Sequence, residues 1–174
     1  MSKKLGLNPD VCYMLGVYKA YKREEPCICL ETDSEKLVER FVQIAVQRLD
    51  VKPEKLLIES TTPGTKAMFY NSKLKRLFEE ALEDRERIFK YKNEYSASYM
   101  AALFDTGGWI DGKGIFIRGD KMDFMLLERL GFHTTTRGAK CYLRNGVQFM
   151  AFIKPYSIKL IDMAKTGRRA PQSG

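Results

Sequence analysis

Basic and aromatic side chains alternate with apolar ones in the second half of the chain, as expected of a strand with one exposed face. Cys141 and Leu143 share the phase of a buried face. Lys140, Tyr142 and Arg144 share the opposite phase. Cations that contact phosphates and rings that stack on bases are the side chains that hold nucleic acid. The alternation therefore predicts a nucleic-acid-binding face on this strand.

The same argument extends this face to neighbouring segments of the second half. Ile115 and Ile117 share the buried phase, so Phe116 and Arg118 are expected to point outward. The basic segment after residue 165 adds two arginines that a partner would order. The predicted contact residues of the second half are Lys113, Arg118, His133, Thr135, Arg137, Lys140, Tyr142, Arg144, Arg168 and Arg169.

The equivalent surface of the first half is less suited to phosphates. Lys66 and Tyr70 have the outward phase there, but Glu31 and Glu59 share it and would repel a nucleic acid. The net charge of +8 is also uneven. Residues 1–90 hold 17 Lys and Arg against 15 Asp and Glu, whereas residues 91–174 hold 13 against 7. We expect the second half to lead binding, the alternative being a surface charged only for solubility.

The cysteines give little support to a metal site or cofactor. Cys12, Cys27, Cys29 and Cys141 form no C-x-x-C pair, and His133 stands apart from them. They are interpreted as buried thiols in a reducing compartment, and no metal or cofactor is expected. The chain has no long apolar run and no apolar stretch behind its first lysines, so we expect a cytoplasmic protein without a membrane partner.

The chain contains an internal repeat. Residues 13–20 (YMLGVYKA) align with 99–106 (YMAALFDT) at an offset of 86. Residues 62–71 align with 136–145 at an offset of 74, with Thr, Gly, Lys and Asn identical in place. Two matches in the same order indicate a duplication. It divides the chain into repeats 1–90 and 91–165, followed by a basic tail, 166–174.

Each repeat is predicted to contain the same elements. An apolar helix over 9–21 or 94–105 comes first, then a strand over 27–31 or 115–118. Asp33 and Asp120 are expected to cap the second helices. Hairpins over 55–70 and 132–144 turn at Pro63-Gly64 and Arg137-Gly138. Closing helices span 71–90 and 146–164, the latter kinked or broken by Pro155.

These features resemble the LAGLIDADG homing endonuclease family in its single-chain, two-repeat form. Residues 100–108 (MAALFDTGG) and 109–114 (WIDGKG) carry the best likeness. Residues 124–132 (FMLLERLGF) and 153–156 (IKPY) also look like that family, whereas in the first half only 14–22 (MLGVYKAYK) does. The resemblance implies an α/β (α+β) monomer of two pseudo-twofold-related repeats, each helix–strand–helix–hairpin–helix, whose strands form a saddle-shaped antiparallel sheet.

The resemblance also implies a packed pair of motif helices with an acid at the foot of each. Small residues let such helices approach closely, and here they are Gly16, Ala20, Ala102 and Thr106. The family's two acids hold divalent metal ions beside the scissile phosphate. Tyr21 and Gly107 stand at those positions. Both acids are therefore lost, and Asp105 and Asp111 are the fallback candidates for metal ligands nearby.

The sequence thus predicts a non-catalytic nucleic-acid-binding protein derived from this family. Its ligand would be DNA or structured RNA, including RNA within a ribonucleoprotein assembly such as the ribosome. One alternative is an active endonuclease that uses Mg²⁺ through displaced ligands. The other is a protein-interaction module without a nucleic-acid role.

Overall fold

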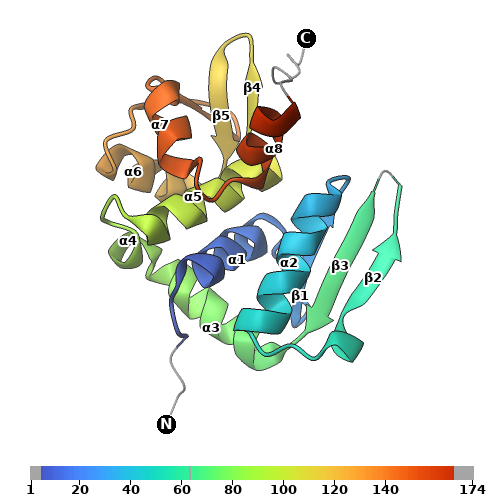
Figure 1. Ribbon diagram of the computed structural model, residues 1–174. Helices are drawn as coiled ribbons and strands as arrows, with labels where there is room; N and C mark the ends of the chain where they lie inside the picture. Colours follow the sequence, from blue (N-terminus) through green and yellow to red (C-terminus); the bar gives the residue numbers. More distant parts are fainter. Residues whose placement is uncertain (1–4, 63, 167–174) are drawn as a thin grey trace.

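A computed structural model describes residues 5–62 and 64–166, which form two halves with a similar order of elements, except that the second half has an additional strand after its first helix (Figure 1). The first half consists of α1 (Pro9–Ala20), β1 (Cys27–Thr32), α2 (Glu35–Arg48), a 3₁₀ turn (Pro53–Lys55), β2 (Leu57–Ser60), β3 (Thr65–Tyr70), α3 (Ser72–Glu83) and α4 (Arg85–Ile88). The second consists of α5 (Glu94–Gly107), β4 (Trp109–Asp111), β5 (Gly114–Arg118), α6 (Lys121–Arg129), β6 (Thr134–Arg137), β7 (Lys140–Leu143), α7 (Gly146–Ile153) and α8 (Ile158–Thr166). The predicted α/β class is confirmed.

Local capping sets where the helices begin. The Asn8 side chain accepts a hydrogen bond from the N–H of Val11, and Pro9 occupies the first turn of α1. Asp120 caps α6 in a reciprocal capping box with Asp123. The prediction that Asp33 caps α2 is wrong. Ser34 is the residue immediately before the helix, and its hydroxyl accepts the bond from the N–H of Leu37.

Helices α1 and α5 pack against each other at the centre of the molecule (Figure 1). Gly16 lies at the crossing, where an added Cβ would be 2.6 Å from Cβ of Ala102 and 2.8 Å from the carbonyl oxygen of Tyr99. Only glycine allows this approach. The predicted packing residue Ala20 is exposed, and it lines a pocket together with Thr106.

The strands form two antiparallel sheets with the orders β1-β3-β2 and β4-β5-β7-β6. Between described residues the two sheets share no ladder, so the expected saddle is built from two sheets rather than a continuous one. Ile28, Leu30, Ala67 and Phe69 turn one face of the first sheet toward the core. Ile115, Ile117, Cys141 and Leu143 do the same for the second sheet.

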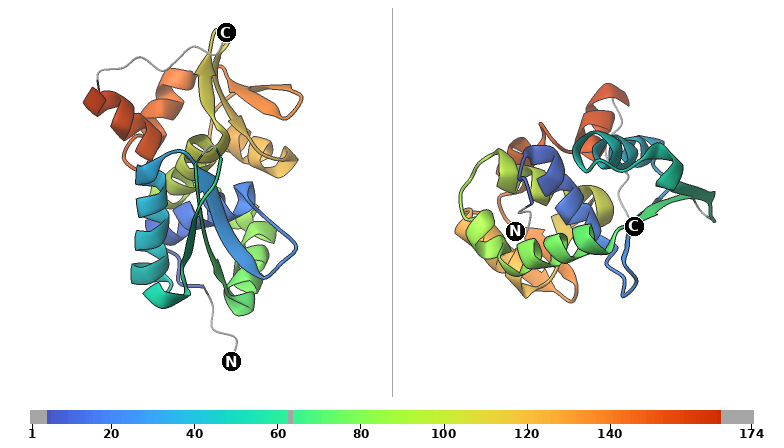
Figure 2. Two further views of the ribbon diagram at one scale, coloured as in Figure 1. Left: turned by 90° about the vertical axis from the view of Figure 1, so that its right-hand side faces the viewer. Right: turned by 90° about the horizontal axis from the view of Figure 1, so that it is seen from below.

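The closing segment of each half is two helices instead of one. Helix α3 ends at Glu83 and α4 begins at Arg85, with Asp84 between them, and α7 ends before Lys154 and the predicted breaker Pro155. Ser157 then starts α8 by accepting a hydrogen bond from the N–H of Leu160. Figure 2 shows α8 standing away from its own sheet, and Asp162 of α8 forms an ion pair with Lys36 of α2.

Three sequence predictions lie partly or wholly outside the described residues. They are the turn residue Pro63 and the tail arginines Arg168 and Arg169. Within residues 5–62 and 64–166, no helix combines the length and hydropathy needed to cross a bilayer.

Candidate nucleic-acid interface

The outward face of the second sheet gathers three cations into one row across its strands. Arg118 of β5 is opposite Lys140 of β7, and Lys140 is opposite Arg137 of β6. The next row on the same face contains Trp109, Phe116, Tyr142 and Thr135, in strand order. We call these two rows the basic face. Strand register therefore places a line of positive charge beside a line of aromatic rings.

The aromatic row supports the cations. Lys140 Nζ lies 4.4 Å from the Phe116 ring centroid, and the Arg137 guanidinium lies 5.9 Å from that of Tyr142. The Phe116 and Tyr142 ring centroids are 5.4 Å apart. Phe116 points outward as predicted, but only 5% of it is exposed because its neighbours cover it. It serves as a platform under the cations, whereas Tyr142 is half-buried and Arg118 and Arg137 are exposed.

Other predicted contact residues lie at the border of the basic face. Arg144 Nε donates a hydrogen bond of 3.2 Å to Thr135 Oγ1. The Tyr142 hydroxyl donates one of 2.7 Å to Asp111 Oδ2, and the N–H of Lys113 donates one of 2.8 Å to Asp111 Oδ1. The bond from Tyr142, with that from Lys113, holds the pKa of Asp111 below its usual value. This possible metal ligand is therefore an anion already held by two donors.

His133 lies farther out, at the edge of the second sheet. Its side chain is exposed, and Nδ1 lies 3.6 Å from Oε2 of Glu128. The other carboxylate oxygen of Glu128 accepts bonds from the N–H and the hydroxyl of Thr134. Glu128 thus stabilises the start of β6 and places one negative charge beside His133.

The outward face of the first sheet differs in charge. Lys66 of β3 lies between Glu31 of β1 and Glu59 of β2 in one row. Its charge is flanked by carboxylates on both neighbouring strands, so this surface lacks the excess of cations on the basic face. Tyr70, two residues beyond Met68 on β3, is 53% exposed.

The feet of the two central helices meet at a pocket of about 260 Å³. Tyr21 follows α1, Gly107 ends α5, and both line this pocket together with Lys19 and Arg118. An added Cβ at Gly107 would lie 3.2 Å from Cβ of Arg118. Burial raises the pKa of Tyr21, and the nearby Glu31 raises it further, so its phenol stays neutral. These residues do not fit a divalent metal ion, which needs anionic or carbonyl oxygen ligands.

A second pocket, of about 360 Å³, lies on the other side of Tyr21 and contains Glu31, Asp33 and Asp105. The carboxylate of Asp105 has a structural role. Its oxygens accept hydrogen bonds from the hydroxyls of Tyr13 and Ser157 and from two backbone N–H groups at the start of α8. Burial raises the pKa of Asp105, although these four bonds oppose the rise. In the parts of the chain that are described, no group of three or more His, Cys, Asp or Glu residues could hold a metal ion.

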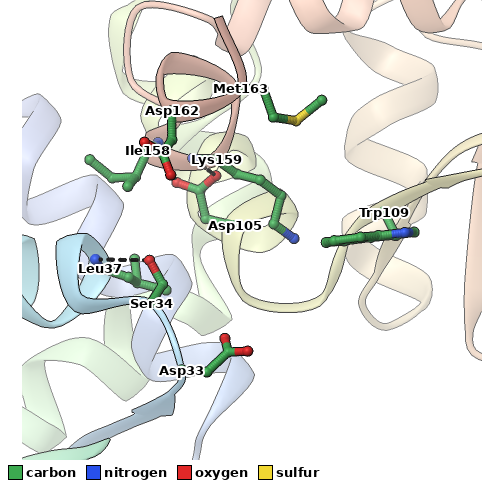
Figure 3. A pocket seen from close by; sticks show the side chains of 9 residues that line it. All are labelled: Asp33, Ser34, Leu37, Asp105, Trp109, Ile158, Lys159, Asp162 and Met163. Atoms are coloured by element: carbon green, nitrogen blue, oxygen red, sulfur yellow. Dashed lines mark hydrogen bonds between the residues drawn. The ribbon is translucent and has the colours of Figure 1, made fainter. Parts of the chain in front are cut away.

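The neighbouring pocket of about 210 Å³, drawn in Figure 3, shows how α8 is anchored to the central helix. Lys159 extends toward Trp109, with Nζ 4.6 Å from the ring centroid. Its Nζ also donates to the carbonyl oxygens of Phe104 and Gly108 at the end of α5. Burial lowers the pKa of Lys159, although Asp105 and Asp33 oppose that change.

Trp109 and Lys159 are not among the site residues predicted from the sequence. An Asp-Gly pair at 111–112, between the apolar segments 109–110 and 115–117, is a hairpin signal that predicts β4 and hence the place of Trp109. No local pattern marks Lys159, because its partners are carbonyl groups more than 50 residues away.

No protein-family model and no curated protein matches the sequence. Solved structures do match the fold. The homing endonuclease I-DmoI in complex with DNA and Ca is 19% identical over 90% of this chain and 97% of its own, with a TM-score of 0.66. I-DmoI in complex with DNA and Mn is 20% identical over 83% of this chain and 96% of its own, with a TM-score of 0.64. Mesophilic variants of I-DmoI are 20% identical over 83% of this chain and 94% of their own, with a TM-score of 0.64. The chain therefore has the fold of this homing endonuclease, as the resemblance to the LAGLIDADG family implies.

Proposed function

We propose that this chain is a non-catalytic nucleic-acid-binding protein derived from a LAGLIDADG homing endonuclease. The observation that carries the proposal is the row Arg118, Lys140 and Arg137 beside the aromatic row of the same sheet. The solved neighbours include a homing endonuclease in complex with its target DNA. The basic face is the part of this chain whose chemistry suits such a ligand.

In this proposal the cations contact phosphates, and Tyr142 offers a partly exposed ring for stacking. Lys113, His133 and Arg144 extend the contact at the border of the sheet. The first sheet contributes less, because Glu31 and Glu59 flank Lys66. Such uneven contact suits DNA or a structured RNA held mainly by the second half, and the RNA could belong to a ribonucleoprotein assembly such as the ribosome.

The loss of catalysis follows from the foot of the central helices. Neutral Tyr21 and Gly107 occupy the positions of the two acids, and Lys19 and Arg118 line the same pocket. Lys19 is paired with Asp120 and Asp123, but Arg118 adds a positive charge and no carboxylate lines this pocket. Such a lining disfavours Mg²⁺. We further propose that the protein acts as a cytoplasmic monomer of two duplicated repeats, 1–90 and 91–165.

A binding titration with a duplex DNA and a hairpin RNA, repeated at several salt concentrations, tests the proposal. If about four to six cations contact phosphates, log K falls against log salt with a slope of about −3 to −5. Binding that ignores salt, or no binding to either probe, would refute the nucleic-acid role.

Two other functions rest on specific observations. Glu31 and Asp33 both line the 360 Å³ pocket, and they are candidates for displaced metal ligands of an active endonuclease. Such an enzyme would nick supercoiled plasmid with Mg²⁺ or Mn²⁺, and EDTA would stop the reaction. The first sheet exposes Leu57, Ile58 and Tyr70, as a protein-interaction module would. That module would show no salt-dependent retention on nucleic acid.

A further inference from the structure

Three sulfur-bearing side chains gather on the outward face of the first sheet. Cys27 and Cys29 share one phase of β1, and Met68 of β3 is directly opposite Cys29. The three form a buried cluster separate from the main core, with exposed fractions of 2%, 2% and 6%. Tyr21 packs against this cluster. The register of two antiparallel strands thus brings three sulfur-bearing side chains into one cluster.

One of the two thiols is held by the end of α1. Cys27 and Cys29 are free cysteines, two residues apart on one face of β1. Cys29 Sγ donates a hydrogen bond of 3.5 Å to the carbonyl oxygen of Tyr21. Both thiols pack in the same buried cluster, as two ligands of one small ion must.

The ligand set is chemically selective. Thiolate and thioether sulfurs are soft ligands and prefer Cu(I) over hard cations such as Mg²⁺. Structural Zn²⁺ sites take four ligands, drawn from Cys, His and carboxylates, and this cluster offers two thiols and a thioether. Its burial would also exclude water from the ion.

Nearby cations offset part of the charge of a loaded site. Two thiolates and one monovalent cation leave a net charge of −1. The charges of Arg23 and Lys66 favour a negative charge on Cys27. Both cations are shared with Glu31, which forms an ion pair with Arg23 and lies opposite Lys66 on the neighbouring strand.

We propose that Cys27, Cys29 and Met68 form a three-sulfur site for one soft monovalent cation of the Cu(I) class. Binding replaces two S–H bonds with two metal–sulfur bonds and adds the Met68 thioether as the third donor. Two protons go to solvent for each ion bound, and neither the metal nor sulfur changes oxidation state. The site is independent of the basic face and of any nucleic-acid role.

The test is an anaerobic titration of the reduced full chain with Cu(I), supplied as its acetonitrile complex, against a chelator whose Cu(I) complex is coloured. The protein is expected to withdraw one ion per chain and to release about two protons per ion into a weakly buffered indicator solution. X-ray absorption of the loaded protein should show a first shell of sulfur only. Failure to compete with the chelator, or a shell of nitrogen and oxygen, would overturn the proposal.

Variants locate the site. Cys27→Ser and Cys29→Ser should each lower the Cu(I) affinity by about 100-fold or more, and Met68→Leu by about 10-fold. Cys141→Ser is the matched control, because it removes a buried thiol from the core face of the other sheet. Uptake that survives in Cys27→Ser and Cys29→Ser, or is lost in Cys141→Ser, would place the ion elsewhere. Added Cu(I) should raise the Tm of the parent but not that of Cys27→Ser, which separates lost binding from altered folding.

Discussion

The hydroxyl of Tyr13 in α1 donates a hydrogen bond of 2.5 Å to Oδ2 of Asp105 in α5, so a buried bond joins the two halves of the chain. The aligned tyrosine of the second repeat, Tyr99, donates instead to Asp123, at 2.7 Å. Lys19, which aligns with Asp105, also forms an ion pair with Asp123. Each central helix thus keeps a tyrosine bonded to a buried acid, but the repeats take that acid from different elements.

Asp105→Asn should lower the free energy of unfolding by about 2–4 kcal/mol, as measured by urea denaturation. The amide of asparagine has one acceptor oxygen, whereas both carboxylate oxygens of Asp105 accept hydrogen bonds. The NH₂ group would therefore face donors that lose their acceptor, and each unpaired buried donor costs about 1–3 kcal/mol. Asp84→Asn is the control, since it alters only an exposed ion pair with Arg87 and should leave stability nearly unchanged. Equal stability of Asp105→Asn and the parent would show that the four bonds are not formed in solution.

Gly16→Ala should destabilise the protein by about 1–3 kcal/mol, because its Cβ would overlap Ala102 and the Tyr99 carbonyl at the helix crossing. Gly6→Ala has no atom within 4 Å of its new Cβ and is the matched control. Thermal unfolding of both variants checks this. A Tm for Gly16→Ala equal to that of the Gly6 variant would mean that α1 and α5 lie too far apart at this crossing for the added Cβ to touch Ala102.

Removing cations from the basic face should weaken nucleic-acid binding and its salt dependence together. Arg137→Ala, Lys140→Ala and Arg144→Ala should each reduce the magnitude of the salt slope by about one unit. Lys66→Ala should have a smaller effect, because Glu31 and Glu59 flank this lysine. Titrations of the four variants at several salt concentrations make the comparison. The basic face is misassigned if Lys66→Ala alone weakens binding.

Tyr142→Ala should lower affinity while leaving the salt slope unchanged, because it removes a stacking ring and no charge. Tyr142→Phe separates the role of the ring in stacking from the role of the hydroxyl as a donor to Asp111. It keeps the ring but frees Asp111 from its hydroxyl donor, and should retain most of the affinity. A reduced salt slope for Tyr142→Ala would indicate that Tyr142 chiefly positions Arg137, whose guanidinium lies over its ring.

Restoring acids at the foot of the helices should create a cation site where the parent has none. Tyr21→Asp combined with Gly107→Asp places two carboxylates at one pocket, although Arg118 beside position 107 will pair with one of them. Adding Arg118→Ala should therefore strengthen Mn²⁺ binding further, as measured by calorimetry. Mn²⁺-dependent nicking by the parent chain, abolished by EDTA, would contradict the assignment of Tyr21 and Gly107.

Acid should weaken the link between Asp120 and Arg85. Burial opposes ionisation of Asp120, but the bond from Arg85, the N–H of Asp123 and the charge of Lys19 outweigh it and hold the pKa below the ordinary 3.8. A depressed pKa stabilises the fold above pH 3.8, and this contribution is lost as pH falls below that value. Asp120→Asn keeps the helix cap but loses the charge. Its stability deficit should be full at pH 6 and shrink below pH 4, and a deficit independent of pH would be inconsistent with this account.

The sequence by itself determined where α1, α5 and α6 begin and which faces of the strands point outward. Asn8 and Asp120 cap helices through contacts only three residues away, and strand phase depends only on alternation. The outward phase of Arg118, Arg137 and Lys140 was therefore predictable, and so was the absence of acids at Tyr21 and Gly107.

Only the tertiary structure decided which contacts the side chains make on those faces. Three features join segments that are far apart in the chain. They are the neighbours that cover Phe116, the four donors around Asp105, and the sulfur cluster of Cys27, Cys29 and Met68. Their partners are set by the register of paired strands and by the docking of α8 on the end of α5. A local pattern specifies which face a side chain takes, but its contacts depend on what the rest of the fold brings against that face.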